Sequence, residues 1–181
     1  MRWAARPLLL AISLMLLQPA LAGAPPEPDG YRVENYRAPT PATLSGAIVL
    51  TTDEASELWR QHSAIFIDVL PQPPRPANLS PRTLWHAPSR NSIPGAVWLP
   101  NVGFGEIAAE TDAYFQRGLA AASGGDQTRP LVFFCERNCW MSWNAAKRAM
   151  TYGYSAVRWF PDGTDGWKET DLPLEKVEKA P

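Results

Sequence analysis

The chain has 181 residues, of which 45% are hydrophobic and 19% are charged, and its formal net charge at pH 7 is -1. The charge balance and the absence of a basic run exclude a typical nucleic-acid binder, because such proteins neutralise phosphates with clustered lysine and arginine. The length suits one domain, and two cysteines are too few for a small disulfide-dependent fold, so the fold must rest on its hydrophobic core.

Residues 1–22 have the pattern of a cleavable export signal. A basic start with Arg2 and Arg6 precedes the apolar run 8–17, and small residues then favour cleavage after Ala22. The apolar run is shorter than the roughly 20 residues that a membrane-spanning helix needs. Removal of these residues takes away two arginines and brings the net charge to about -3. We therefore expect a periplasmic protein without a membrane span after processing.

The mature chain begins with an arm that leads into a domain. Residues 23–43 are rich in proline and polar residues without a sustained period, which predicts an extended arm. The domain is predicted over 44–174, with a short strand at 46–50 and a helix at 51–61 that has a threonine cap and early acidic residues. The continuous apolar run at 64–70 predicts a strand that is covered on both faces.

A long proline-rich connection and further strand–helix units complete the predicted domain. Residues 71–92 have no period, and long connections of this kind inside compact domains are often functional loops. The later predicted elements are a turn that leads into a short strand within 93–100, strands at 130–134 and 156–160, a helix at 111–122, and a helix from Met141 that stops at Gly153. The strand at 156–160 is predicted to be the last, with turns, a short helix and a tail at 175–181 after it.

Short apolar strands that alternate with helices predict an α/β fold: a single domain with a mostly parallel central sheet and helices on both faces. Sites in such sheets form beyond the carboxyl ends of the strands. Cys135 follows a predicted strand at that end. The fold therefore places the first of the two cysteines where chemistry is expected.

Four motifs in this order resemble rhodanese-like domains. They are AIFIDVL at 64–70, NSIPGAVWLP at 91–100, LVFFC at 131–135 and the closing run from Asn144 to Trp167. The stretch CERNCWMSWNAAKR at 135–148 resembles more closely a rhodanese-like family marked by Cys-x-x-x-Cys-Trp. That family accompanies bacterial alcohol oxidation with pyrroloquinoline quinone (PQQ). The resemblance implies a rhodanese-like domain at 44–174, activity through Cys135, and partners in a periplasmic PQQ-dependent dehydrogenase system.

The chain departs from the usual rhodanese pattern at several positions. Trp140 stands where an arginine is usual five residues after the cysteine, and Ser142 comes one place late. The arginine often found after Asp-Val is Leu70, and the histidine often found before Ile-Pro-Gly-Ala is Ser92. Without a fixed cation a dianion loses charge-assisted hydrogen bonds, so we expect thiosulfate to be a poor sulfur donor.

Cys135 is the predicted catalytic thiolate. Its position between a strand and a helix faces free N–H groups and the positive end of the helix dipole, and Arg137 adds charge. We therefore expect Cys135 to have a pKa below that of an ordinary thiol and Cys139 to be less perturbed. A buried, inert cysteine is the alternative. The predicted binding loop consists of Glu136, Arg137, Asn138, Trp140, Met141 and Ser142.

Cys139, the second predicted catalytic residue, has three possible roles. It can resolve an oxidised sulfur on Cys135, hold Cu(I) or another soft metal together with Cys135, or form a structural disulfide. His62 and His86 complete a metal site only if the fold brings them in. The predicted substrate is a small sulfur compound or thiol, with no cofactor. The alternative is a non-catalytic module that binds copper, a redox cofactor or a partner protein through the same loop.

Three further residues have predicted roles around the loop. Asp68, at the end of its strand, is expected to support the loop by accepting backbone N–H bonds, with a simple strand-end cap as the alternative. Trp140 is expected to wall the pocket or stack on a flat ligand. Trp143 is expected in the core, as aromatic residues more often bury area.

Overall fold

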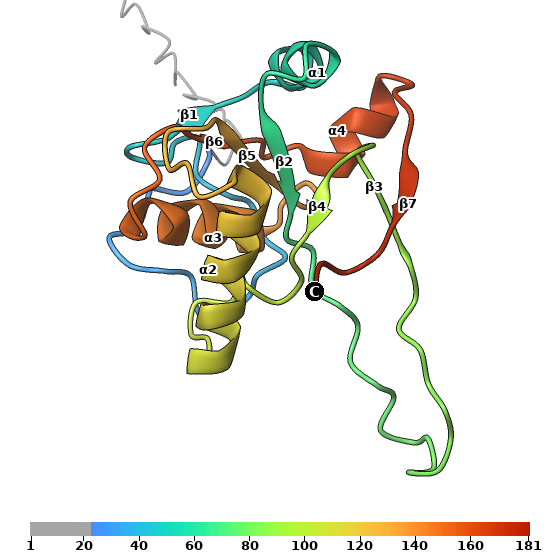
Figure 1. Ribbon diagram of the computed structural model, residues 1–181. Helices are drawn as coiled ribbons and strands as arrows, with labels where there is room; N and C mark the ends of the chain where they lie inside the picture. The colour runs from blue at the N-terminus through green and yellow to red at the C-terminus, as the bar shows by residue number, and fades with distance from the viewer. Residues whose placement is uncertain (1–22) are drawn as a thin grey trace, which may run out of the picture.

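The computed structural model describes residues 23–181, so the export signal predicted at 1–22 lies outside the described residues. A five-stranded sheet with the order β1-β6-β5-β2-β4 forms the centre, and every neighbouring pair in it is parallel (Figure 1). Its strands are β1 (Ile48–Val49), β2 (Ile65–Asp68), β4 (Val97–Trp98), β5 (Leu131–Phe134) and β6 (Val157–Trp159). The helices are α1 (Thr52–Arg60), α2 (Ala109–Ser123), α3 (Trp140–Thr151) and α4 (Gly163–Glu169). The predicted α/β fold with a mostly parallel sheet is confirmed.

The core has two halves, one on each face of the sheet. Successive side chains of β5 point to opposite faces, so Phe133 joins one half and Phe134 the other. The first half includes residues of α2 and α3, and the second includes residues of α1 and α4. All four side chains of β5 are buried, as its continuous apolar sequence predicts.

The ends of two helices follow directly from the local sequence. Thr51 caps α1 by accepting the N–H of Glu54, and the Glu54 carboxylate accepts the N–H of Thr51, which is a capping box. Gly124 ends α2 in the left-handed conformation with φ 67°. The predicted helices at 51–61 and 111–122 are thus present within a few residues of their expected bounds.

A second sheet of two antiparallel strands lies beside the domain and was not predicted. It pairs β3 (Arg90–Ser92) with β7 (Glu175–Val177). The expectation that the strand at 156–160 is the last is therefore wrong, and the predicted tail 175–181 contains a strand. Both segments are short, and β7 carries charged residues, so neither has an apolar period that would reveal a strand.

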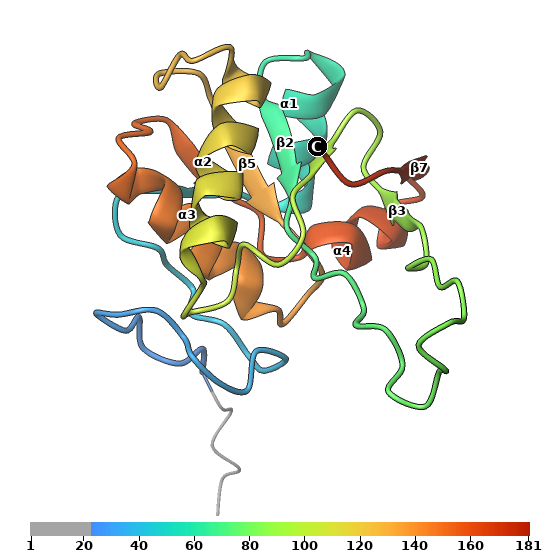
Figure 2. The same cartoon turned by 60° about the horizontal axis from the view of Figure 1, so that its bottom comes forward.

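The arm (residues 23–43) lies along α3 (Figure 2). Asn144 accepts a hydrogen bond from the Arg32 N–H at 2.9 Å and donates to the Arg32 carbonyl at 2.8 Å. The indole N–H groups of Trp140 and Trp143 donate to the carbonyls of Pro39 and Thr43, each at 3.1 Å. The arm is thus held by side chains of α3 rather than by regular secondary structure. Among residues 23–181, no helix is both long enough and apolar enough to cross a membrane.

Candidate functional site

Cys135 lies at the carboxyl edge of the central sheet. In the parallel pairing of β2 with β5, Asp68 lies opposite Phe134. These are the last residues of the two strands, so the segments that follow them begin side by side at the same edge of the sheet. The Cys135 carbonyl accepts the N–H of Thr164 at 3.0 Å, and Gly163 approaches so closely that a Cβ there would lie 2.5 Å from the Cys135 oxygen. This contact fixes the start of the cysteine loop (residues 135–139) against α4.

The two thiols lie side by side inside the protein. Both cysteines are free, Cys135 is fully buried and Cys139 is 2% exposed. The Cys135 thiol donates to the Cys139 carbonyl at 3.5 Å. Burial raises the pKa of Cys135 well above its usual value, and the neighbouring Cys139 raises it further.

Cys139 is the more acidic thiol of the pair. The adjacent Cys135 thiol is the largest influence, and together with the backbone N–H of Met141 and the guanidinium of Arg37 it lowers the pKa of Cys139 to about 7 against the opposing effect of burial. The directions of the two pKa shifts are opposite to the expectation of a lowered pKa for Cys135 and a less perturbed Cys139. The helix start acts on the sulfur of Cys139 because α3 begins one residue after it.

A buried ion pair supports the loop from β2 and β3. Asp68 accepts hydrogen bonds from Arg90 Nε at 2.8 Å, from the Ser92 hydroxyl at 2.5 Å and from the Leu70 N–H at 2.9 Å. Arg90 in turn donates to the Cys135 carbonyl at 3.4 Å. Burial raises the pKa of Asp68, and Arg90 and Ser92 oppose that shift. Asp68 thus supports the cysteine loop through Arg90. The hydrogen bond that its carboxylate accepts from the Leu70 N–H caps the end of β2.

Sequence reasoning missed Arg90, which lies near the end of the proline-rich connection, three residues before Ile93 of the Ile-Pro-Gly motif. A buried arginine needs a partner, and the side chain of Arg90 is 9% exposed while that of Asp68 is fully buried. Asp68 at the end of its strand was the feature of the sequence that could have indicated such an arginine, because a buried carboxylate requires a cation or several hydrogen-bond donors. The sequence separation of 22 residues concealed which arginine fills this role.

The arm brings a second arginine to the loop that sequence reasoning also missed. Arg37 and Cys139 form an antiparallel bridge, in which the Trp140 N–H donates to the Tyr36 carbonyl at 2.9 Å. The Arg37 guanidinium lies 2.9 Å from the Glu136 carboxylate. Arg37 therefore supplies a positive charge beside Cys139, whereas the sequence predicted a charge from Arg137 beside Cys135.

Arg137 faces away from the sulfurs. Its guanidinium donates to the carboxylates of Asp162 at 2.9 Å and Glu169 at 2.5 Å and 2.6 Å, and these partners raise its pKa. Its N–H donates to Asp165 at 3.1 Å. The expectation that Arg137 stabilises the Cys135 thiolate is wrong, because acidic residues of α4 and of the turn before it hold the side chain. Asn138, with φ 55°, makes the left-handed turn that separates Arg137 from Cys139.

The aromatic residues after the loop are structural. Trp140 begins α3 and is 2% exposed, so the expectation that it walls the pocket from within the loop is wrong. Its ring lies edge to face with Trp143 at 5.5 Å between centroids, and Trp143 is fully buried as predicted. The Ser142 hydroxyl donates to the Cys139 carbonyl at 3.2 Å and accepts the Trp159 indole N–H at 3.0 Å.

A cavity of about 560 Å³ opens over Cys139. Residues of the arm, the loop, the end of β2 and α3 line it: Asn35, Tyr36, Arg37, Leu70, Pro71, Glu136, Cys139 and Met141. Cys135 does not line this cavity. The wall is apolar apart from Asn35 and the Arg37–Glu136 pair, and of the two cysteines only Cys139 borders the cavity.

The described residues hold no cluster of three or more histidine, cysteine, aspartate or glutamate side chains that could bind a metal ion. His62 and His86 are therefore not gathered around the cysteines. Cys135 and Cys139 are the only two cysteines in residues 23–181, and both are free.

No protein-family model matches the chain, and no curated protein matches it. Among solved structures, it is similar to the polysulfide-sulfur transferase homodimer from Wolinella succinogenes, with 20% identity over 72% of this chain and 80% of that one and a TM-score of 0.45. It is also similar to EanB, solved as a cysteine persulfide in a tetrahedral intermediate state with ergothioneine. That likeness has 20% identity over 80% of this chain and 34% of that chain, with a TM-score of 0.50. At these identities the comparison concerns the fold alone, and the likeness to EanB agrees with the α/β architecture described above.

Proposed function

We propose that this protein carries out thiol redox or sulfur-transfer chemistry in which Cys139 is the attacking thiolate and Cys135 the resolving thiol. One observation carries the proposal: Cys139 faces the cavity and has its pKa lowered to about 7, while Cys135 lies buried beside it. A thiolate with a pKa near ambient pH combines a large ionised fraction with good nucleophilicity. The roles of the two cysteines are thus exchanged relative to the sequence-based expectation.

The reaction with a disulfide proceeds in two exchange steps. The Cys139 thiolate attacks one sulfur of the substrate, forms a mixed disulfide and releases the first thiolate. Cys135 then gives up its proton and attacks the Cys139 sulfur, which releases the second thiolate and leaves a Cys135–Cys139 disulfide. The protein pair loses two electrons, and the substrate disulfide becomes two thiols. With a sulfane-sulfur donor, the Cys139 thiolate instead attacks the outer sulfur, whose bond to the donor breaks; this leaves a persulfide on Cys139 and releases the rest of the donor as an anion.

The arm favours the disulfide reaction over thiosulfate chemistry. The first N–H of α3, on Trp140, donates to the Tyr36 carbonyl and is not available to a substrate oxyanion. The nearby Arg37 is already paired with Glu136. A dianion therefore finds fewer donors here than an open anion cradle would offer, whereas thiol–disulfide exchange needs only a thiolate, a resolving thiol and access.

The proposed setting is the periplasm, in association with PQQ-dependent alcohol oxidation. The export pattern of residues 1–22 and the Cys-x-x-x-Cys-Trp motif at 135–140 support it. The deciding measurement is N-terminal sequencing of protein from a periplasmic fraction. A chain that begins at Gly23 supports the proposed location, and an intact Met1 in a membrane fraction contradicts it.

The chemistry is tested with 2-hydroxyethyl disulfide, a small neutral substrate. The wild type should release two thiols and lose two thiol groups of its own, with a rate that rises as the pH passes about 7 because the Cys139 thiolate forms there. Cys139→Ser should abolish the release of the first thiol. Cys135→Ser should stop after the first exchange, and intact mass spectrometry should then find the substrate fragment trapped on Cys139.

A parallel assay measures thiocyanate formed from thiosulfate and cyanide. We expect little turnover, and brisk turnover without any internal disulfide would make the protein an ordinary sulfurtransferase. Copper bound at one equivalent in freshly isolated protein, and lost in either cysteine variant, would favour the non-catalytic copper-binding alternative. Trapping of the substrate fragment on Cys135 in the Cys139→Ser variant would instead identify Cys135 as the attacking thiolate, as the sequence predicted.

A further inference from the structure

The connection between β2 and β3 projects from the domain as a long loop, which we call the projection (residues 71–89). Figures 1 and 2 show it extending away from both sheets and from all four helices. Within it, Leu84 is 81% exposed, more than any other large apolar residue in the described part of the chain. A loop of this length without regular structure in a compact domain commonly has a functional role.

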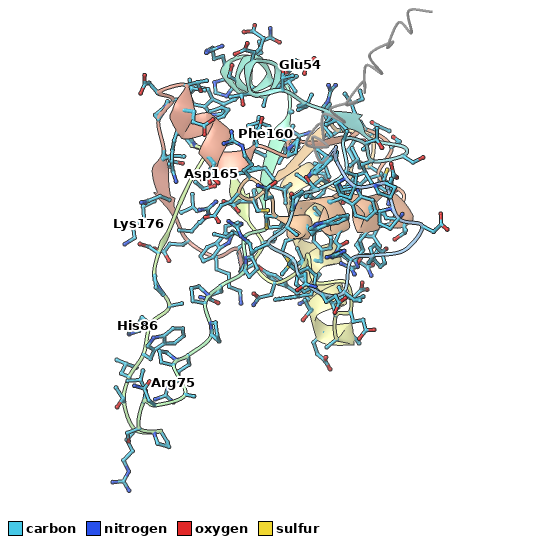
Figure 3. The ribbon with its side chains drawn as sticks, turned by 180° about the vertical axis from the view of Figure 1, so that it is seen from behind. Glu54, Arg75, His86, Phe160, Asp165 and Lys176 are labelled. Carbon is cyan, nitrogen blue, oxygen red and sulfur yellow. The ribbon has the colours of Figure 1, made fainter. Side chains whose placement is uncertain are left out.

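The projection is preshaped rather than a random coil. Six of its residues are proline, which narrows the backbone conformations available to it. Arg75 donates to the carbonyls of Ser80 at 2.5 Å and Thr83 at 3.0 Å, so one guanidinium closes the tip on itself. Figure 3 shows Arg75 and His86 on the projection, away from the body of the protein. A preshaped loop loses less conformational entropy when a partner binds.

The charge of the projection is opposite to that of the whole chain. It carries Arg75, Arg82 and His86 and no aspartate or glutamate, whereas the full chain has a net charge of -1. Arg82 is exposed and forms no ion pair with any residue in 23–181. A cationic surface without acidic residues favours an anionic partner, and it acts mainly on the rate of encounter.

The two ends of the projection, where it joins the domain, lie next to the cavity over Cys139 and the cavity beside it. The projection begins three residues after Asp68, which is level with Phe134 and so with the start of the cysteine loop. Leu70 and Pro71 line the cavity over Cys139, and they also line a neighbouring cavity of about 280 Å³ together with Pro88 at the other end of the projection. The projection therefore leaves the domain beside the cavity over Cys139, so a partner bound to it is tethered near that cavity.

We propose that the projection docks an acidic segment of a partner protein whose disulfide is the substrate of Cys139. The inference rests on the proposed thiol chemistry and adds the class of partner. Arg82 supplies the free charge, Leu84 the apolar contact, and Arg75 the fixed shape of the tip. The docking is expected to raise the rate of reaction with acidic disulfide substrates and to weaken as salt screens the charges.

Two peptides of about 24 residues test the kinetic effect, since a chain of this length extends to roughly 80 Å and can span the loop and the cavity. Each has one cysteine as a mixed disulfide with thionitrobenzoate, followed by a glutamate-rich tail or the matched glutamine-rich tail. The readout is the ratio of the two rates of thionitrobenzoate release. We expect a ratio of about five to ten for the wild type at low salt, falling towards one at high salt. The double variant Arg82→Glu/Leu84→Ser should bring it to one or below, and the exposed α2 control Arg117→Gln should not change it.

Fluorescence anisotropy with the same acidic peptide, its cysteine replaced by serine, measures docking without chemistry. Binding by the wild type that is lost in the double variant supports the proposal even if neither peptide reacts, in which case the thiol chemistry is what fails. Equal rates and no anisotropy change, with normal turnover of 2-hydroxyethyl disulfide, overturn the docking and leave the proposed function in place. Binding to vesicles of anionic phospholipid without binding to the acidic peptide also overturns it, in favour of a membrane surface.

Discussion

The arm and the projection are both rich in proline and both lack regular secondary structure, yet they occupy opposite environments. The arm is fixed to α3 by side chains that reach its carbonyls, among them Asn144 and Trp140. The projection extends from the domain, and its tip is held mainly by its own Arg75. Composition alone therefore does not decide whether an irregular segment is docked or exposed. The decisive factor is whether another element presents donors for the backbone carbonyls that proline leaves in place.

The largest expected difference between the two regions comes from removing a tryptophan. Trp140→Ala should lower the free energy of unfolding by about 3–5 kcal/mol, because it empties a buried site and breaks the bond to the Pro39 carbonyl. The matched change Trp85→Ala in the projection should cost about 1 kcal/mol or less, since Trp85 is only half-buried. Urea unfolding measures both. Similar losses would mean that the projection is as much a part of the core as the arm contact.

A smaller effect is expected from the amide that holds the arm. Asn144→Ala removes three hydrogen bonds, two to Arg32 and one to the Gly103 carbonyl, and should lower the free energy of unfolding by roughly 2–4 kcal/mol. It should also speed tryptic cleavage after Arg32, because the arm is released more often. Asn78→Ala, at an exposed position of the projection, is the matched control. Cleavage at wild-type rate would show that the arm stays docked without Asn144.

The third comparison concerns the chemistry that the arm contributes. Arg37→Gln should raise the pKa of Cys139, because Arg37 is one of the groups that lower it to about 7. The thiolate forms only as pH rises through the pKa, so alkylation at pH 7 should slow by roughly twofold to tenfold. Cys135→Ala should raise the pKa more, since the Cys135 thiol is the largest influence. Iodoacetamide kinetics against pH report the shift, and Arg82→Gln should leave the curve in place.

The smallest effect is expected when the projection is shortened. Replacement of residues 74–87 by a short glycine–serine linker should change the free energy of unfolding by about 0.5 kcal/mol or less, because closing a shorter loop costs little and few contacts disappear. Thermal unfolding measures the change. A loss of several kcal/mol would show that the projection stabilises the domain, and it would remove the contrast with the arm.

Most of the fold follows from local patterns in the sequence. The buried strand 131–134 is apolar throughout, and Thr51 and Gly124 have the residue types that begin and end helices. These features act over a few residues, so they can be recognised without knowledge of the tertiary structure. The two short strands β3 and β7 escape such recognition, because their pairing joins positions that are about 85 residues apart.

The site was predictable in location but not in electrostatics. The strand-to-helix position of Cys135 indicates where the chemistry lies, but not which sulfur faces the cavity. That depends on how residues 36–37 of the arm pair with the loop, a contact across about 100 residues. Arg137, adjacent in sequence, is held by acidic side chains around α4, while the distant Arg37 and Arg90 reach the cysteines.

The bridge between Arg37 and Cys139 also sets the order in which the protein assembles. The arm is synthesised first, but α3 and the cysteine loop appear about 100 residues later, so the arm has nothing to dock on until most of the chain has emerged. The cavity over Cys139 therefore cannot be completed before the cysteine loop is in place. Until the arm closes, Cys139 lacks its neighbours Tyr36 and Arg37, so under the proposed export the protein would meet an oxidising compartment before this thiol is covered.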